Sequence, residues 1–234
     1  LKALNTPKPV AAAPQPRPVA PVPAPKPAPV SANAGPSRSG LQTQCNAGQA
    51  LACGRLGIQL TKGEDGPVDK AGARAAFRKG CDGSDAASCA LLGFSLSEGD
   101  GGPVDLAGAR TAYQKGCDGG DTDIRKQSCF MIGRMLERGQ GGSVNKAGAR
   151  AAFFQGCYAD DADACFALGF LHSNGEGGPV NKTAARTSYQ KGCDGGNASA
   201  CHNLGLLLSE GEGGPVNKTA ARTAYQKGCD GGNA

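Results

Sequence analysis

The chain has 234 residues, with 38 glycines, 11 cysteines, no tryptophan and a formal net charge of +5. Residues 1–40 hold five basic residues and no acid, which leaves 20 basic and 20 acidic residues in the remainder. A nucleic-acid-binding domain would carry a basic patch on its folded part, and we therefore expect no nucleic-acid partner. No apolar run is long enough to cross a membrane.

Residues 1–43 form a segment rich in proline and alanine. Eleven of the fifteen prolines lie between Pro7 and Pro36. Such a composition favours extended polyproline II and cannot form a packed core. We predict a disordered linker over residues 1–43 that acts as a semi-rigid spacer. A docking site for a proline-recognising or envelope partner is the alternative.

From residue 44 onwards the cysteines recur at a fixed period. The first cysteines of successive units are 36 residues apart, or 40 where residues 122–125 form an insertion. A period of this length is typical of a helical repeat array. The predicted disulfides join two cysteines across each short turn: Cys45–Cys53, Cys81–Cys89, Cys117–Cys129, Cys157–Cys165 and Cys193–Cys201.

The spacing within each pair requires the chain to reverse. Eight residues of unbroken helix would separate the Cα atoms by about 12 Å, whereas a disulfide needs about 4.4–6.8 Å. Glycines such as Gly83 supply the reversal, in the left-handed conformation that ends helices. Free buried thiols are one alternative. A zinc site is another, but the chain has no CxxC, and its only histidines are His172 and His202. We expect no metal and no cofactor.

Each unit is predicted to hold a longer helix A and a shorter helix B. In residues 89–96, Cys89, Leu92, Gly93 and Leu96 follow the spacing of one buried helix face. The glycine recurs in every unit, which suggests that another helix backbone crosses closely there. Two sets of polar residues are predicted to be N-caps: Asp85, Asp121, Asp161 and Asn197 for helix A, and Asp69, Asp105, Asn145, Asn181 and Asn217 for helix B. An arginine column on helix B is expected to be solvated or paired with carboxylates: Arg74, Arg110, Arg150, Arg186 and Arg222.

Both ends of the chain favour a longer protein. The chain begins at Leu1, and Cys229 has no partner at the expected spacing before Ala234. We expect the partner of Cys229 three residues beyond Ala234, and an export signal or an envelope or membrane anchor upstream of residue 1. Five disulfides predict an oxidising compartment: the periplasm, the cell surface or the exterior.

The Leu92-Gly93 pair, the glycine-rich loop, Asp105, Tyr113 and Lys115-Gly116-Cys117 resemble the Sel-one-like repeat family. The paired cysteines are similar to its disulfide-bridged branch, the Helicobacter cysteine-rich proteins. The resemblance implies an all-α fold, a right-handed α/α solenoid of about five disulfide-linked helix pairs over residues 44–234. One departure is the glycine column at Gly66, Gly102, Gly142, Gly178 and Gly214, where the family usually has valine; we expect a changed loop and an unchanged fold.

The resemblance implies a secreted or periplasmic scaffold, which we expect to be a monomer that binds a protein or peptide. Weak β-lactam binding or hydrolysis, described for some members, is the alternative function. Ser143 and Lys146 match the Ser-x-x-Lys string of serine β-lactamases. However, both stand in ordinary repeat columns, so we predict no catalytic residue. His172 occupies a leucine column and is expected to be a packing residue.

Positions of helix A that vary between units are the better candidates for recognition, because such arrays commonly bind partners through this helix. The predicted surface comprises Leu91, Phe94, Met131, Arg134, Phe170 and Leu206. Exposed Phe94 and Phe170 would act as anchors in a peptide groove. The alternative is that both rings pack against the neighbouring unit.

Overall fold

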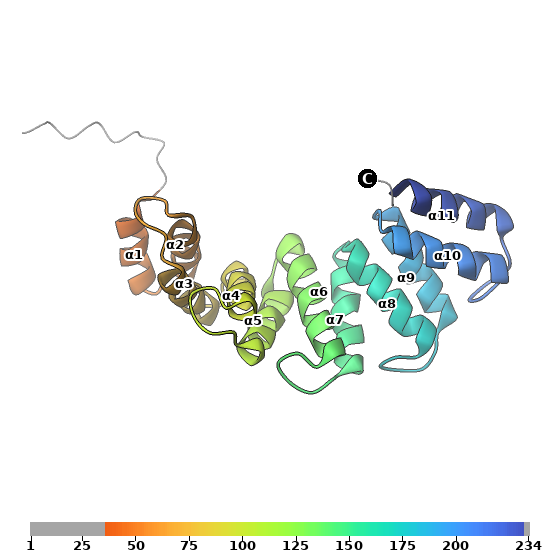
Figure 1. Ribbon diagram of the computed structural model, residues 1–234, viewed down its shortest axis with the longest axis horizontal. Coiled ribbons are helices and arrows are strands. Elements are labelled where there is room, and N and C mark those ends of the chain that lie inside the picture. The colour runs from red at the N-terminus through yellow and green to blue at the C-terminus, as the bar shows by residue number, and fades with distance from the viewer. Residues whose placement is uncertain (1–35, 232–234) are drawn as a thin grey trace, which may run out of the picture. The chain divides into compact units, whose positions relative to one another are not determined.

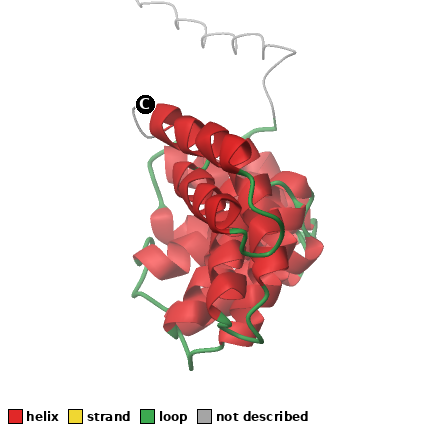
Figure 2. Cartoon of the chain, turned by 90° about the vertical axis from the view of Figure 1, so that its right-hand side faces the viewer, coloured by secondary structure: helices red, strands yellow, loops and turns green. Residues whose placement is uncertain are grey.

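The computed structural model describes residues 36–231, which fold into eleven α-helices with no strand among them (Figures 1 and 2). The helices are α1 (Arg38–Asn46), α2 (Ala50–Lys62), α3 (Lys70–Asp82), α4 (Ala86–Glu98), α5 (Leu106–Gly119), α6 (Thr122–Arg138), α7 (Lys146–Tyr158), α8 (Ala162–Asn174), α9 (Lys182–Asp194), α10 (Ala198–Glu210) and α11 (Lys218–Gly231). The even-numbered helices are the predicted A helices, and the odd-numbered ones are the B helices.

The helices pack in chain order. Each helix contacts the helix before it and the helix after it, and more lightly the next but one (Figure 1). Packing that involves only near neighbours in the sequence is the property of a solenoid. The predicted all-α solenoid is therefore confirmed, with five A–B pairs that follow the lone B helix α1.

The predicted boundary between linker and repeats is wrong, because residue 43 lies inside α1. Ser37 caps this helix by accepting a hydrogen bond from the Gly40 backbone N–H. Leu41 and Cys45 of α1 are buried in the core of the first units. A helix with buried residues belongs to the repeat array, so the array begins several residues earlier than predicted. Residues 1–35 of the predicted linker lie outside the described residues.

Helices A and B differ by at most one residue in four of the five pairs, contrary to the prediction of a longer A helix. Both α3 and α4, for example, have 13 residues. The exception is α6, whose 17 residues include the insertion at residues 122–125. Asp121 caps α6 directly before these residues, so the insertion adds one helical turn and does not lengthen a loop.

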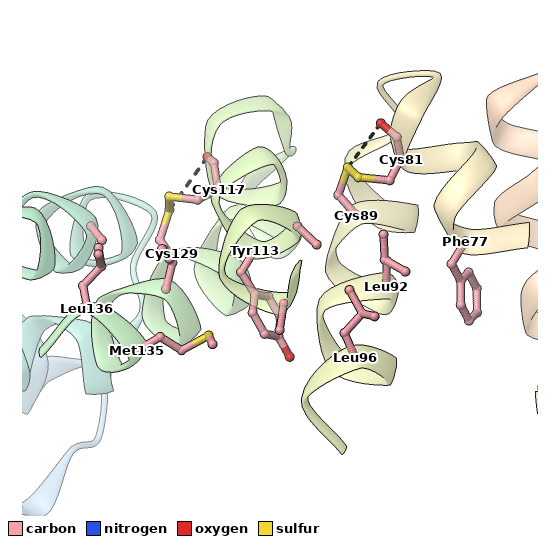
Figure 3. Packing of buried hydrophobic residues seen from close by; sticks show 14 of the residues in the cluster. Phe77, Cys81, Cys89, Leu92, Leu96, Tyr113, Cys117, Cys129, Met135 and Leu136 are labelled. Atoms are coloured by element: carbon pink, nitrogen blue, oxygen red, sulfur yellow. Dashed lines mark hydrogen bonds between the residues drawn. A yellow bond between two sulfur atoms is a disulfide. The ribbon is translucent and has the colours of Figure 1, made fainter. Parts of the chain in front are cut away.

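All five predicted disulfides are present, and each joins the end of a B helix to the start of the next A helix. Figure 3 shows two of them, Cys81–Cys89 and Cys117–Cys129. Their Cα–Cα distances of 4.4–4.7 Å lie at the short end of the usual range. The left-handed residue of the turn is not Gly83, as predicted, but Ser84. Equivalent positive φ angles occur at Gly48, Asp160 and Gly196. Cys229 is free and exposed.

The predicted caps form as expected. Asp85, Asp121, Asp161 and Asn197 cap the A helices. The side chains of Asp69, Asp105, Asn145, Asn181 and Asn217 accept hydrogen bonds from backbone N–H groups in the first turn of the B helices. These bonds satisfy donors that a helix start leaves unpaired.

The recurring glycine of helix A faces an aromatic ring, not a helix backbone as predicted. A Cβ atom at Gly93 would lie 2.8 Å from the ring of Tyr113, and one at Gly57 would overlap the ring of Phe77. The same pairing occurs in the other three units: Gly133 with Phe153, Gly169 with Tyr189 and Gly205 with Tyr225. Glycine is therefore needed because the aromatic side chain of helix B fills the space of its missing side chain.

The arginine column joins successive units, a role that the sequence analysis did not predict. Arg74, on α3, is 8% exposed and donates hydrogen bonds to the carbonyl oxygens of Ser95 and Pro103, among others, in the next unit. Arg110, Arg150 and Arg186 donate to the equivalent loop carbonyls, those of Ser143, Pro179 and Pro215. These four guanidinium groups therefore bind backbone carbonyls, whereas we expected solvation or pairing with carboxylates; Arg222, the last of the column, is exposed.

Candidate binding surface

One exposed row of side chains runs along the A helices. Five residues after the second cysteine, four units carry an apolar residue with a large exposed fraction: Ile58 38%, Phe94 50%, Phe170 41% and Leu206 39%. Arg134 takes this position in α6 and is half-buried. Exposed apolar side chains at the same position of successive helices mark a surface that can bind a partner.

The first groove lies between α2 and α4, over α3. Ile58 and Phe94 stand on its two sides, and Phe77 and Leu91 contribute apolar surface. Its volume is about 230 Å³. The rim is polar: the ammonium group of Lys70 lies 2.7 Å from the carboxylate of Asp100. An apolar floor with a polar rim is the arrangement expected of a site for an apolar side chain.

The second groove repeats this arrangement between α6 and α8, over α7. It has a volume of about 300 Å³ and is lined by Phe130, Phe153, Phe166, Phe170 and Arg134, among others. The Arg134 guanidinium lies over the Phe130 ring, 5.6 Å from its centroid. This groove is therefore more aromatic than the first, and it has an arginine at the position where the first has Ile58.

The predicted surface residues are divided among these features. Leu91 and Phe94 line the first groove, and Arg134 and Phe170 line the second. Met131 is partly buried against the core, and Leu206 is exposed on α10. Phe94 and Phe170 are 50% and 41% exposed, and each also lines a groove together with a residue of the preceding unit, Ile58 and Arg134 respectively.

The phenylalanines that complete the grooves were not among the predicted surface residues. Phe77 and Phe153 occupy a column of helix B that is aromatic in every unit, with Tyr113, Tyr189 and Tyr225 at the other positions. Phe130 and Phe166 stand one residue after the second cysteine, where the first unit has Gly54 and the second has Ala90. The change from small to aromatic residues in that column is the signal that could have identified the second groove.

Helix α7 carries a separate pair of exposed aromatic side chains, Phe154 and Tyr158, which are 54% and 71% exposed. In three other B helices the equivalent residues are a glutamine and an aspartate joined by a hydrogen bond. Lys191 lies over the Tyr158 ring, 5.9 Å from its centroid. This pair gives the molecule exposed aromatic surface on a B helix as well as on the A helices.

Ser143 and Lys146, which match the β-lactamase string, make structural contacts. The Ser143 backbone carbonyl accepts a hydrogen bond from Arg110. The Lys146 ammonium lies 2.6 Å from the carboxylate of Glu176. This lysine therefore forms an ion pair with the next unit.

His172 lies at the edge of the packing, half-buried, with its Nδ1 next to the guanidinium of Arg150. Burial lowers the pKa of His172, and the positive charge of Arg150 lowers it further. The other histidine, His202, lies against the Tyr225 ring. Its neighbour Cys201 is bonded to Cys193.

Within residues 36–231, none of the helices combines the length and apolar character that a membrane crossing needs.

Comparison with known proteins identifies the repeats. The family model for the Sel1 repeat matches residues 86–121, 126–153, 162–197 and 198–233, more than half of the chain. No curated protein matches the chain in sequence.

Solved structures share the fold. One is a protective antigen present in uropathogenic Escherichia coli strains and displaying an SLR fold, with 26% identity and a TM-score of 0.75 over 84% of this chain. The match covers 41% of the antigen, so the chain spans about two fifths of its length. A Sel1 repeat protein from Oxalobacter formigenes has 20% identity and a TM-score of 0.67, over 83% of this chain and 76% of its own. The fold, the repeated units and the family match together establish that this chain belongs to the Sel1 repeat family, with a disulfide at the turn between successive units.

Proposed function

We propose that the chain is an exported scaffold that binds a protein partner through the exposed face of its A helices. The observation that carries the proposal is the row of exposed apolar residues, with a groove beside Phe94 and another beside Phe170. Membership of a repeat family supports it, because stacked helix pairs offer extended binding surfaces.

The rigid backbone of these units suits such a role. Each turn between units is closed by a disulfide, and loop carbonyls are bound by the arginine of the preceding B helix. A surface that is already ordered loses little conformational entropy when a partner binds. The same bonds require an oxidising compartment, and we propose the periplasm, the cell surface or the exterior as the location.

Capture by the immobilised, oxidised full chain tests the proposal. Partners from an extract of the source organism would be quantified by mass spectrometry for the wild type and for the double variant Phe94→Ala/Phe170→Ala. We expect the variant to lose capture, because it removes the exposed ring beside each groove. Unfolding would be excluded by equal far-ultraviolet circular dichroism and equal melting temperatures.

The matched control is Phe154→Ala/Tyr158→Ala, which removes two aromatic side chains of similar exposure from a B helix. Capture should be unchanged in this control. Loss of capture in the control alone would assign binding to α7 and refute the proposed surface. Equal capture by all three proteins would also refute it.

A further inference from the structure

The two grooves are built from equivalent positions of units that lie two apart. Phe77 and Phe153 occupy the same column of helix B, and Phe94 and Phe170 occupy the same column of helix A. The grooves differ on the side opposite these exposed rings. There the exposed row contributes Ile58 to the first groove and Arg134 to the second. The molecule therefore presents two related apolar sites that differ by one charge on this row.

The guanidinium of Arg134 is placed to accept a ligand. It lies over the Phe130 ring, and it makes no hydrogen bond or ion pair with any residue in the range 36–231. A guanidinium held near an aromatic face by a cation–π contact still has N–H groups to offer, and a carboxylate can accept from two of them. Arg74 on α3, in contrast, has its N–H groups bound to carbonyl oxygens of the next unit.

Two acidic residues also line the second groove, and neither is paired with Arg134. The carboxylate of Asp163 accepts a hydrogen bond of 2.6 Å from the side chain of Asn197. Glu137 stands on α6 near its end, beside Arg138. The formal charges of the whole groove cancel. A preference for a carboxylate therefore has to come from the N–H donors of Arg134, at the middle position of the exposed row, and not from the net charge of the groove.

We infer that the grooves recognise different side chains of one protein partner, an inference that rests on the proposed function. The groove between α2 and α4 binds an apolar side chain alone. The groove between α6 and α8 binds an apolar side chain, aromatic or aliphatic, that has a carboxylate next to it. Arg134 binds that carboxylate and is the residue that determines the specificity of the second groove.

Selection of random peptides displayed on phage, with the oxidised full chain as target, tests this inference. We expect the selected peptides to carry apolar residues with Asp or Glu beside one of them. In synthetic versions, changing the acid to its amide should weaken binding to the wild type about tenfold, since a hydrogen-bonded charge pair contributes about 1.5 kcal/mol or more. The Arg134→Ile variant should bind the acid and amide peptides equally.

The equivalent position supplies matched controls. Isoleucine occupies the equivalent position in the first unit, as Ile58, so the Arg134→Ile variant should fold. The Arg134→Gln variant removes the charge without adding apolar surface and should give the same result. In the converse variant Ile58→Arg, selected peptides should carry a second acid. If no peptide is selected, or if acid and amide peptides bind the wild type equally, the inference is overturned. One further outcome would overturn the inference but leave the proposed function intact. In it, the selected peptides show no preference for an acid, and the Phe94→Ala/Phe170→Ala variant does not bind them.

Discussion

Arg74 illustrates how one side chain connects two units. Its guanidinium is almost completely buried and donates to the carbonyl oxygens of Ser95, Asp100, Gly102 and Pro103 at distances of 2.6–3.1 Å. These carbonyls lie near the end of α4 and in the loop that follows it, where a helix leaves its last acceptors unpaired. One residue therefore satisfies acceptors that would otherwise be left without partners.

Replacing Arg74 should destabilise the protein. We expect Arg74→Met to lower the free energy of unfolding by about 2–4 kcal/mol, because it leaves several carbonyl groups without donors. Denaturant unfolding monitored by circular dichroism measures the change. The control is Arg222→Met in the same column of α11, where the arginine is exposed; its effect should stay within about 0.5 kcal/mol. Equal effects of the two substitutions would contradict the role assigned to Arg74.

His172 should make the protein sensitive to mild acid. Its pKa in the folded state is lowered, by burial first and by Arg150 second, so the unfolded chain binds a proton more readily. Its contribution to stability is complete above the ordinary histidine pKa of about 6.5 and is lost as the pH falls below that value. We therefore expect the melting temperature to fall between pH 7.5 and pH 5.5.

The His172→Leu variant restores the residue found in the same column of the other units and should show a smaller fall. Asp160 and Asp194 do not interfere, because their lysine partners lower their pKa values below 3.8. Burial raises the pKa of Asp161, which favours the folded state in acid and so acts in the opposite direction. An identical pH dependence in the wild type and the variant would exclude His172 as the cause.

At the scale of the helix, glycine and the aromatic ring that covers it form one packing unit. The Tyr113 ring fills the space that a side chain at Gly93 would need. This arrangement explains why a residue that costs about 1 kcal/mol in a helix interior relative to alanine recurs in every A helix.

The variant Gly93→Ala should therefore be destabilised despite its higher helix propensity. We expect a loss of about 1–3 kcal/mol from overpacking against Tyr113, measured by thermal or denaturant unfolding. Gly119→Ala is the control, since a Cβ atom there would meet nothing closer than Ala86 at 3.8 Å, and it should be neutral or slightly stabilising. A stabilised Gly93→Ala variant would show that the ring does not need the glycine.

The helices and their caps could be predicted because they depend on nearby residues. An Asp or Asn followed by a buried face is sufficient to place a helix start, as at Asp85 and Asn145. The prediction assigned the left-handed conformation of the turn to Gly83, because glycine adopts it at little cost. In the structure Ser84 adopts it instead. The role of the glycine column required the partner ring, which lies on another helix and cannot be read from local spacing.

For the whole molecule, the disulfides reinforce local structure and do not connect distant units. Each spans eight residues, or twelve at the insertion, and the helices pack mainly on their neighbours. In such an array stability is close to a sum of contributions from units and their interfaces.

Removal of one disulfide should therefore act locally. We expect Cys81→Ala/Cys89→Ala to lose about 2–3 kcal/mol on the chain-entropy estimate for so short a loop. Amide hydrogen exchange should accelerate in α3 and α4 and stay unchanged in α9 and α10. Uniform acceleration over all helices would show that the array unfolds as one cooperative body.

The candidate surface was predictable only in part. Variation between units pointed to Phe94 and Phe170, because residues that differ on a repeated helix are free of the packing that makes the others uniform. The grooves themselves depend on Phe77 and Phe153. Their positions in the sequence indicate buried residues, and nothing in the spacing indicates that they also line a groove. The contact of Arg134 with Phe130 likewise depends on side-chain placement, which spacing does not determine.

Site-specific photo-crosslinking tests the central claim, that the A helices form the binding face, most directly. A photoreactive phenylalanine analogue would replace Phe94 or Phe170 on the A helices, and Phe154 or Tyr158 on α7, in the full chain under oxidising conditions. We predict that irradiation joins the partner to positions 94 and 170 and not to 154 or 158. Crosslinks at positions 154 and 158 alone, or none at 94 and 170 in a sample that still binds the partner, would contradict the account.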